Sequence, residues 1–221
     1  MLVAGIDEAG RGPILGPMVF AGVLMKEKDI IRLAELGVRD SKLLRPFERE
    51  KLAAAILELA VKVSMKVVRP KEIDDAKAVG VNLNQLEAFC FADIINQLNP
   101  DVTYVDAADV NPERFSQMIR NYLLVDTELI SQHKADCDVL VVSAASILAK
   151  VERDKMISEL KRFGDVGSGY CHDPRTISFL KKWVKEHGEL PSFARHSWIT
   201  AKNILNEVKQ TVLDEFQQKK K

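Results

Sequence analysis

The sequence has little cysteine, and its few cysteines are arranged for neither disulfides nor zinc. Only three occur among 221 residues, at Cys90, Cys137 and Cys171. Their odd number and wide spacing lack the paired pattern of a zinc site, and no signal-peptide pattern opens the chain. These absences predict free thiols in a reducing compartment, and therefore a cytoplasmic protein.

The sequence also lacks an excess of charge and a long apolar run. Thirty-two Lys and Arg residues balance 32 Asp and Glu residues, so the net charge gives no strong positive field for attracting nucleic acid. This balance is weak counter-evidence, because local patches bind polyanions independently of the total. The longest nearly uncharged stretch, residues 139–149, is too short to span a bilayer core of about 30 Å. We therefore expect a globular protein without a membrane-spanning segment.

Short apolar runs come first along the chain, and helical patterns dominate its end. Runs rich in β-branched residues predict strands at residues 2–6, 18–25, 61–68, 102–105 and 129–133. Within residues 61–68, Val61, Val63, Met65 and Val67 alternate with polar side chains, which predicts a half-buried strand with these four facing the core. Helical spacing and capping residues predict helices at residues 46–60, 82–98, 112 onward, 139–162, 174–187 and 197–216. This order predicts an α/β fold with a mixed central sheet flanked by helices and a helical carboxyl-terminal extension.

Acidic residues follow three of the predicted strands. They are Asp7 and Glu8 after the first strand, Asp106 after residues 102–105, and Asp136 after residues 129–133. Ligands gather at strand carboxyl ends in open α/β sheets, and neighbouring carboxylates are costly to bury unless a cation neutralises them. Oxygen ligands of this kind suit Mg²⁺ or Mn²⁺. The alternative is that single acids after strands are turn residues or helix caps, an interpretation that applies most to Asp136.

One geometric requirement accompanies the pair Asp7 and Glu8. Neighbouring side chains on a regular strand point to opposite faces, so both reach one metal centre only if the backbone twists or bulges there. Gly10 and Gly12 follow at once and allow such a departure.

The loop after these acids reads Gly10-Arg11-Gly12-Pro13-Ile14-Leu15-Gly16. It does not fit the dinucleotide-binding pattern GxGxxG, because the third glycine is one position late and a strand follows instead of a helix. A plain connection between two strands would also need glycine. An arginine between two glycines beside a carboxylate pair, however, favours contact of Gly10, Arg11 and Gly12 with a phosphate or sugar.

Taken together, these segments resemble ribonuclease HII, and the chain length and ending resemble the archaeal branch. The matching motifs stand in the family's order over roughly residues 3–175. They are IDEAGRG followed by Gly16-Pro17, then Asp40-Ser41-Lys42-Leu43, Tyr104-Val105-Asp106, His133-Lys134-Ala135-Asp136, AASILAKVERD at residues 144–154, and Gly167-Ser168-Gly169-Tyr170.

The resemblance implies a ribonuclease H-like fold and a metal-dependent endonuclease. The implied reaction is hydrolysis of the RNA strand of RNA–DNA hybrids, including cuts 5′ of single ribonucleotides in duplex DNA, with 3′-hydroxyl and 5′-phosphate ends. Such an enzyme serves DNA replication and repair. The resemblance further implies two divalent ions, Mg²⁺ or Mn²⁺, held by the four catalytic acids Asp7, Glu8, Asp106 and Asp136.

Substrate contacts are implied in the same way. The loop of Gly10, Arg11 and Gly12 would hold the ribonucleotide's 2′-hydroxyl and adjoining phosphates, and Tyr170 would pack on the next deoxyribose. Ser41, Lys42, Lys150 and Arg153 are further candidates for phosphate contacts, although a capping serine and solvated charged side chains would give the same pattern. Cys171-His172 departs from the proline and serine that are more frequent in relatives, which puts the substrate fit after Tyr170 in doubt and leaves the chemistry untouched.

The end of the chain carries Gln210, Leu213 and Phe216 in the pattern QxxLxxF. It resembles the sliding-clamp (PCNA) binding box of archaeal relatives, with one aromatic where a pair is usual. The alternative is that Leu213 and Phe216 are core residues of the last helix. We divide the chain into a catalytic core at residues 1–168, a helical substrate-binding region at residues 169–209 and a tail at residues 210–221, and we expect a monomer.

Two other functions fit parts of this pattern. A non-catalytic module that binds nucleic acid or a clamp is opposed by the balanced charge, because four acids repel phosphate unless metal is bound. A metal-dependent phosphotransferase acting on small substrates would show no preference for a 2′-hydroxyl.

Overall fold

The computed structural model describes the backbone of residues 1–218 and the side chains of residues 1–210, and its packing divides the chain into two compact units. Unit 1 comprises Met1–Ala9, Met18–Val67 and Val81–Arg153. Unit 2 comprises Gly10–Pro17, Val68–Gly80 and the chain from Asp154 onward. Because these units are defined by packing and not by function, the division at residues 168 and 209 stays a prediction.

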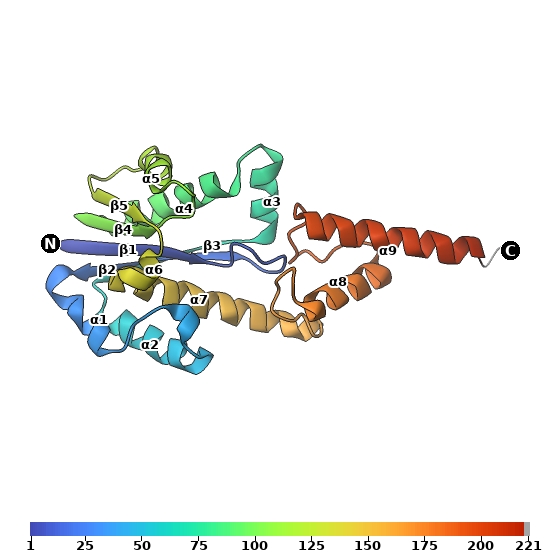
Figure 1. Ribbon diagram of the computed structural model, residues 1–221, viewed down its shortest axis with the longest axis horizontal. Coiled ribbons are helices and arrows are strands. Elements are labelled where there is room, and N and C mark those ends of the chain that lie inside the picture. Colours follow the sequence, from blue (N-terminus) through green and yellow to red (C-terminus); the bar gives the residue numbers. More distant parts are fainter. Residues whose placement is uncertain (219–221) are drawn as a thin grey trace. The chain divides into compact units, whose positions relative to one another are not determined.

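Unit 1 is built on a five-stranded mixed sheet with the strand order β3-β2-β1-β4-β5 (Figure 1). The strands are β1 (Leu2–Ala9), β2 (Met18–Lys26), β3 (Lys62–Val68), β4 (Val102–Asp106) and β5 (Glu128–Gln132). β1 is antiparallel to β2 and parallel to β4, and β4 is parallel to β5. The predicted mixed sheet is confirmed, and β1 continues beyond its predicted end through both acids.

Helices cover both faces of this sheet (Figure 1). α4 (Leu83–Leu98) packs against β1 and β2, and α5 (Pro112–Arg120) packs against β5 and α4. On the other face α7 (Leu140–Leu160) approaches β1 very closely, because a Cβ added to Gly5 would lie 2.3 Å from the main-chain carbon of Val141. The backbones of β1 and α7 are therefore in direct contact at Gly5, where no side chain other than glycine's hydrogen fits.

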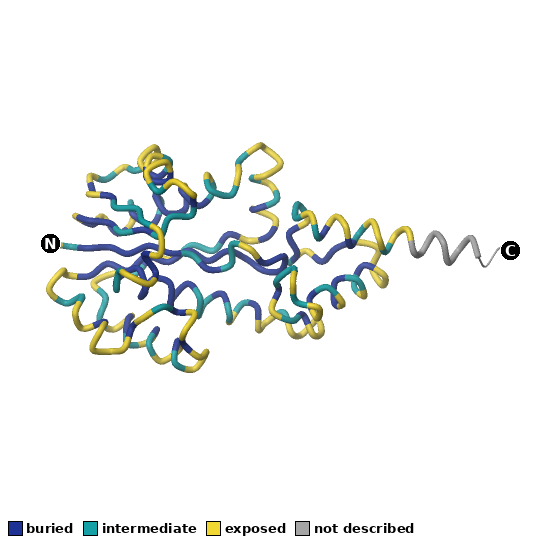
Figure 2. The backbone as a smooth tube through the Cα atoms, viewed as in Figure 1, coloured by how far each residue is buried: buried dark blue, intermediate teal, exposed yellow. Residues whose placement is uncertain are grey.

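The remaining helices of unit 1 are shorter. α2 (Pro46–Leu59) matches the predicted helix at residues 46–60. The short helices α1 (Ile31–Glu35) and α6 (Ala135–Asp138) were not predicted, because one or two turns give too little periodicity to detect. Figure 2 shows β1 and β2 almost wholly buried, as their apolar sequences require.

The buried face of β3 differs from the prediction. Ser64 is 7% exposed, whereas Met65 is 39% exposed. The polar face is turned inward because α4 offers it partners: Ser64 Oγ donates to Gln97 Oε1 at 2.8 Å, and Lys66 Nζ pairs with Asp93 Oδ2 at 2.6 Å. The expectation that Val61 and Met65 would face the core is therefore wrong.

Unit 2 contains α3 (Pro70–Ala78), α8 (Pro174–His187) and α9 (Ile199–Gln218). α8 and α9 pack against each other around an apolar core that includes Ile14, Leu15, Leu180, Val184 and Ala201. α3 was not predicted; α8 and α9 confirm the predicted helical extension. Among the helices of the described residues, none is long and apolar enough to cross a membrane.

Candidate active site

Unit 1 brings the four predicted acids to the same end of its central strands. Asp7 and Glu8 lie near the end of β1, and Asp106 is the last residue of β4. β1 and β4 run parallel with Ile6 opposite Val105, so Asp7 and Asp106 are the next residues on adjoining strands. Asp136 lies in α6, the short helix that contacts β4. Asp7 and Asp136 are each 4% exposed, while Glu8 and Asp106 are half-buried.

No bulge interrupts β1 at the acid pair. β1 pairs with β2 residue for residue through Ala9, with Asp7 opposite Ala21 and Glu8 opposite Phe20. The sequence allowed either a twist or a bulge of the backbone at these two residues. The structure has no bulge there, so that alternative is wrong. The carboxylate of Glu8 nonetheless lies close enough to raise the pKa of Asp7, so the two charges interact at the end of a regular ladder.

Burial and mutual repulsion raise the pKa of two of these acids. The pKa of Asp7 is raised well above its ordinary value, first by burial, then by the charge of Glu8 and, less, by Asp106; a hydrogen bond from Ser146 opposes the rise. The pKa of Asp106 is raised by burial and by Asp136, and is lowered by the main-chain N–H of Ala135, which donates to Oδ1 at 2.9 Å. Ionising this cluster is therefore costly without a cation.

The acids fit a hard divalent ion better than a soft one. Their donor atoms are all carboxylate oxygens, the ligands that Mg²⁺ and Mn²⁺ prefer. Asp40 and Cys137 also lie near Asp136, with one ligand atom from each of the three within 4.8 Å of the others. Burial, followed by the hydrogen bond to Asp136, raises the pKa of the Cys137 thiol to about 11, which disfavours the thiolate form that binds soft metals. Sequence inspection missed this neighbourhood, although Asp40 stands beside Ser41 in the quoted motif.

Lys42 partly neutralises the cluster. Lys42 Nζ lies 2.8 Å from Asp136 Oδ2, and its side chain is 75% exposed. This hydrogen bond raises the pKa of Lys42. Ser41 is buried, and its Oγ lies 2.9 Å from Ser146 Oγ, while Asp40 accepts a hydrogen bond from the N–H of Lys42 and caps the turn. The capping interpretation of Ser41 is therefore wrong, and the phosphate contacts of Ser41 and Lys42 stay predictions.

Unit 2 brings together the predicted substrate loop and Tyr170. A Cβ added at Gly12 would lie 3.7 Å from Tyr170 Cε1, so the half-buried tyrosine ring lies against this part of the loop. The carbonyl of Gly169 accepts from the N–H groups of Ile14 and Leu15, at 2.8 and 3.1 Å. The segment before Tyr170 is thus fastened to the glycine loop by two backbone hydrogen bonds.

The tyrosine segment is held in turn by the start of α8. Asp173 Oδ2 accepts from the N–H of Ser168 at 2.7 Å, and Thr176 Oγ1 accepts from the N–H of Gly169 at 3.0 Å. The hydrogen bonds that Ser168 donates to Asp173, followed by that from the N–H of Arg175, keep the pKa of Asp173 well below its usual range. The Asp173-Pro174 start that sequence analysis identified therefore also orders the loop before Tyr170.

The remaining candidate residues differ in how far they are exposed. Lys150 and Arg153 lie on α7, and Lys150 is half-buried. Arg153 is only 2% exposed. This burial counts against a direct contact of Arg153 with phosphate, and equally against the alternative that it is a solvated charge on the surface of the helix. Gln210 is exposed, whereas Leu213 and Phe216 lie outside the residues whose side chains the structure describes.

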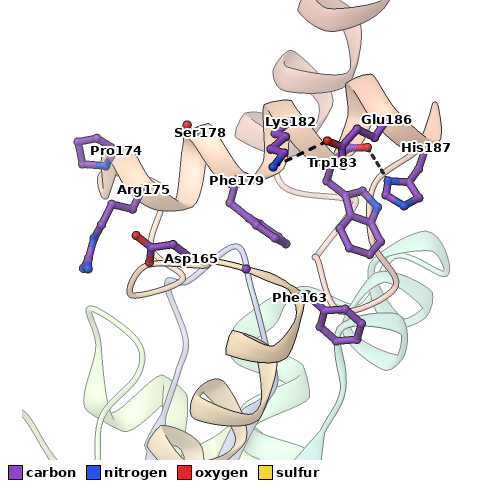
Figure 3. Close-up of a pocket in the computed structure, with 11 residues that line it drawn as sticks. Phe163, Asp165, Pro174, Arg175, Ser178, Phe179, Lys182, Trp183, Glu186 and His187 are labelled. Carbon is purple, nitrogen blue, oxygen red and sulfur yellow. Dashed lines mark hydrogen bonds and ion pairs between the residues drawn. The ribbon is translucent and has the colours of Figure 1, made fainter.

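A pocket in unit 2 contains none of the predicted site residues (Figure 3). Its volume is about 520 Å³, and aromatic rings of Phe163, Phe179 and Trp183 contribute to its wall. Trp183 stacks on His187 with ring centroids 4.2 Å apart, and Phe163 meets Trp183 edge to face. These contacts belong to the aromatic packing around α8.

Comparisons with known proteins point to one family. The family model described as Ribonuclease HII matches residues 4–201. Ribonuclease HII from Pyrococcus abyssi is 45% identical over 98% of this chain and 97% of its own, and that from Methanosarcina barkeri is 47% identical over 96% and 98%.

Solved structures agree with this result. Ribonuclease H2 from Pyrococcus horikoshii has a TM-score of 0.89 at 43% identity, covering 95% of this chain and 99% of its own. Ribonuclease HII in the PCNA:RNase HII complex from Archaeoglobus fulgidus has a TM-score of 0.81 at 42% identity, with 90% and 95% covered. A ribonuclease HIII solved with Mn²⁺ has a TM-score of 0.83 at 21% identity, covering 95% and 71%, and shares the fold. The predicted ribonuclease H-like fold is confirmed.

The raised pKa values predict an unusual effect of Asp7→Asn on stability. A carboxyl whose pKa is higher in the folded than in the unfolded chain stabilises the fold below its unfolded pKa, and this contribution is lost as the pH rises through the folded pKa. With chelator at neutral pH, Asp7→Asn should therefore raise stability by about 1 kcal/mol, or roughly 2–4 °C in Tm.

Thermal unfolding between pH 4 and 8, with chelator and with Mn²⁺, measures this effect. The gain should vanish near pH 4, and Mn²⁺ should stabilise the wild type more than the variant. Asp126→Asn, at an exposed acid, is the matched control and should change nothing. A loss of metal-free stability in Asp7→Asn at neutral pH would contradict the repulsion inferred for the cluster.

Proposed function

The chain belongs to the ribonuclease HII family of metal-dependent endoribonucleases that cut the RNA of RNA–DNA hybrids, and we propose that it also cuts 5′ of ribonucleotides embedded in duplex DNA. The observation that supports catalysis most is the crowding of Asp7, Glu8, Asp106 and Asp136 at one end of the sheet. Their mutual repulsion has no purpose in a module that only binds a polyanion.

The oxygen donors of these four acids fit two divalent ions, Mg²⁺ or Mn²⁺. When bound, such ions supply an activated water and stabilise the leaving 3′-oxygen during displacement at phosphorus, leaving a 3′-hydroxyl and a 5′-phosphate. The protein's part is to hold the carboxylates in place before substrate arrives. The register of β1 and β4 fixes Asp7 and Asp106, and the N–H of Ala135 orients Asp106.

Lys42 balances charge at this site. It pairs with Asp136 in the protein alone, and its large exposure leaves the ammonium free to move to a phosphate oxygen when substrate binds. Ser41, held by Ser146, anchors the segment that carries Lys42. Lys150 adds a further positive charge on α7 as a proposed contact to the nucleic-acid backbone.

Recognition of the ribonucleotide is assigned to the loop of Gly10, Arg11 and Gly12 and to Tyr170. Bare glycine backbone allows close approach to the sugar and its phosphates, and a guanidinium supports the added negative charge. The 2′-hydroxyl distinguishes RNA from DNA at this position. The ring of Tyr170 lies against Gly12, which is compatible with one shared binding surface.

We further propose that the enzyme acts as a cytoplasmic monomer in DNA replication and repair and binds a sliding clamp. Its three cysteines are free thiols, as a reducing compartment allows. A PCNA complex is described for the relative from Archaeoglobus fulgidus, and the QxxLxxF pattern at Gln210, Leu213 and Phe216 supports a similar contact here.

Cleavage of a DNA duplex with one ribonucleotide tests the proposed activity. The wild type with Mg²⁺ or Mn²⁺ should cut once, 5′ of the ribonucleotide, and Asp106→Asn should lower kcat by roughly 10³-fold or more, because the metal ligand set is broken. Asp126→Asn is the control with unchanged rate. A cut that persists in chelator, or that Asp106→Asn leaves intact, would sink the proposal; binding that chelator does not affect would favour a non-catalytic module.

A second prediction concerns Tyr170. Tyr170→Ala should lower kcat/KM on the one-ribonucleotide duplex by roughly tenfold and on an all-RNA hybrid by much less, because the ring is assigned to the RNA-to-DNA junction. Tyr170→Phe, which keeps the ring, should behave nearly as wild type. Tyr122→Ala alters another, 45% exposed tyrosine and serves as the control. Equal losses on both substrates would remove the junction role.

A third prediction concerns the tail. The double variant Leu213→Ala/Phe216→Ala should weaken binding to an archaeal PCNA by at least about tenfold, since buried apolar anchors dominate such contacts. Its cleavage of free substrate should be unchanged. Lys209→Ala, on an exposed neighbour, is the control. Clamp affinity that survives the double variant would show that the pattern is only part of the helix.

A further inference from the structure

Arg195 is a fully buried arginine in unit 2, with 0% of its surface exposed. Its guanidinium donates to three main-chain carbonyls of the loop at residues 10–16. Nε donates to Gly16 O at 3.1 Å, Nη1 to Arg11 O at 2.8 Å and Nη2 to Gly10 O at 2.5 Å. One buried, planar side chain thus binds the main chain at both ends of this loop.

These contacts set the direction of two N–H groups. In a trans peptide unit the C=O of one residue and the N–H of the next point in opposite directions. No peptide bond in the described chain is cis. Because Arg195 draws the carbonyls of Gly10 and Arg11 toward itself, the N–H groups of Arg11 and Gly12 point away from it. Two adjacent outward amides form the kind of concavity that binds phosphate or hydroxyl oxygen.

The segment that carries Arg195 is itself tied down. The N–H of Arg195 donates to Ile14 O at 2.9 Å, and the N–H of Gly16 donates to Phe193 O at 2.9 Å. The guanidinium lies over the ring of Trp198, 4.9 Å from its centroid. On the next residues, Asp74 of α3 accepts from the N–H groups of His196 and Ser197, at 2.8 and 2.9 Å. Arg195 is therefore held by main-chain bonds to the loop, by the ring of Trp198 and, through its neighbours, by Asp74 of α3.

We propose that Arg195 is a positioning residue for ribonucleotide recognition: it orients the outward N–H groups of Arg11 and Gly12. This inference rests on the proposed role of the glycine loop. Arginine suits the task because its donors form a rigid planar fork, whereas the donors of lysine radiate from a single nitrogen. Arg195→Lys keeps the charge and loses the fork, so it separates orientation from charge.

The test compares wild type with Arg195→Lys at a temperature where both are folded. Two quantities are measured: kcat/KM on the one-ribonucleotide duplex, and the inhibition constant of an all-DNA duplex used as competitor. Arg195→Lys should lower kcat/KM roughly tenfold or more, the effect of losing one or two charge-assisted hydrogen bonds, while DNA inhibition stays within about twofold. Val184→Ala, an apolar change in the same core, is the control for plain destabilisation and should alter neither quantity.

Hydrogen exchange of residues 9–17 supplies a readout that does not need activity. Arg195→Lys should speed exchange in this segment roughly tenfold, and Val184→Ala should not. If Arg195→Lys does not fold, Trp198→Phe takes its place: the smaller ring weakens the contact that holds the guanidinium, 4.9 Å from the ring centroid, and should lower the same selectivity by roughly twofold. Unchanged selectivity in this variant would overturn the inference.

The outcomes distinguish a failure of the positioning role of Arg195 from a failure of the proposed role of the glycine loop. Unchanged selectivity in the folded variant, or equal weakening toward both duplexes, overturns the positioning role of Arg195. If the wild type itself shows no preference for the ribonucleotide duplex, the proposed role of the loop fails instead. Faster exchange together with unchanged selectivity leaves Arg195 as a fold-stabilising residue only, and also overturns the inference.

Discussion

Electrostatic repulsion among four carboxylates is the constraint on which the chemistry of unit 1 depends. Parallel pairing of β1 with β4 places Asp7 beside Asp106, and burial then raises the pKa of both. A fold that aimed only at stability would avoid this arrangement, because each ionised group adds cost to the others. Lys42 and the N–H of Ala135 oppose this cost, because both lower the pKa of Asp106.

Unit 2 solves a different problem, that of holding a glycine-rich loop in one conformation. Gly10 and Gly16 have positive φ, and glycine pays the largest backbone entropy when it is ordered. The loop is therefore fixed by hydrogen bonds to its main chain: Gly169 accepts from one side, and Arg195 donates from the other. These contacts turn the N–H groups of Arg11 and Gly12 away from Arg195. The proposed metal site and the proposed sugar-binding loop therefore depend on different interactions: repulsion among carboxylates in unit 1, and hydrogen bonds to the main chain in unit 2.

Local patterns in the sequence predicted most of this, and their failures have physical causes. The strands, the long helices and the positions of the acids were predictable because apolar periodicity and chain punctuation are local signals. The buried face of β3 was not, because Ser64 and Lys66 find partners on α4 that no local pattern reveals. Arg195 escaped notice for the same reason: its contacts with Gly10 and Arg11 join residues 185 and 184 positions apart. The regular pairing of Asp7 and Glu8 with β2 could not be predicted either, because Gly10 and Gly12 indicate only that the backbone is free to bend.

If metal held by these acids contacts the phosphate that is cut, replacing a non-bridging oxygen of that phosphate by sulfur should change the metal requirement. The substrate for this measurement is a duplex with one ribonucleotide. Mg²⁺ binds oxygen far better than sulfur, whereas Mn²⁺ accepts the softer ligand. Cleavage at the substituted position should therefore be strongly suppressed in Mg²⁺ and restored by Mn²⁺ for one of the two sulfur stereoisomers. Equal cleavage of oxygen and sulfur substrates in Mg²⁺, for both stereoisomers, would contradict a direct contact between metal and the scissile phosphate.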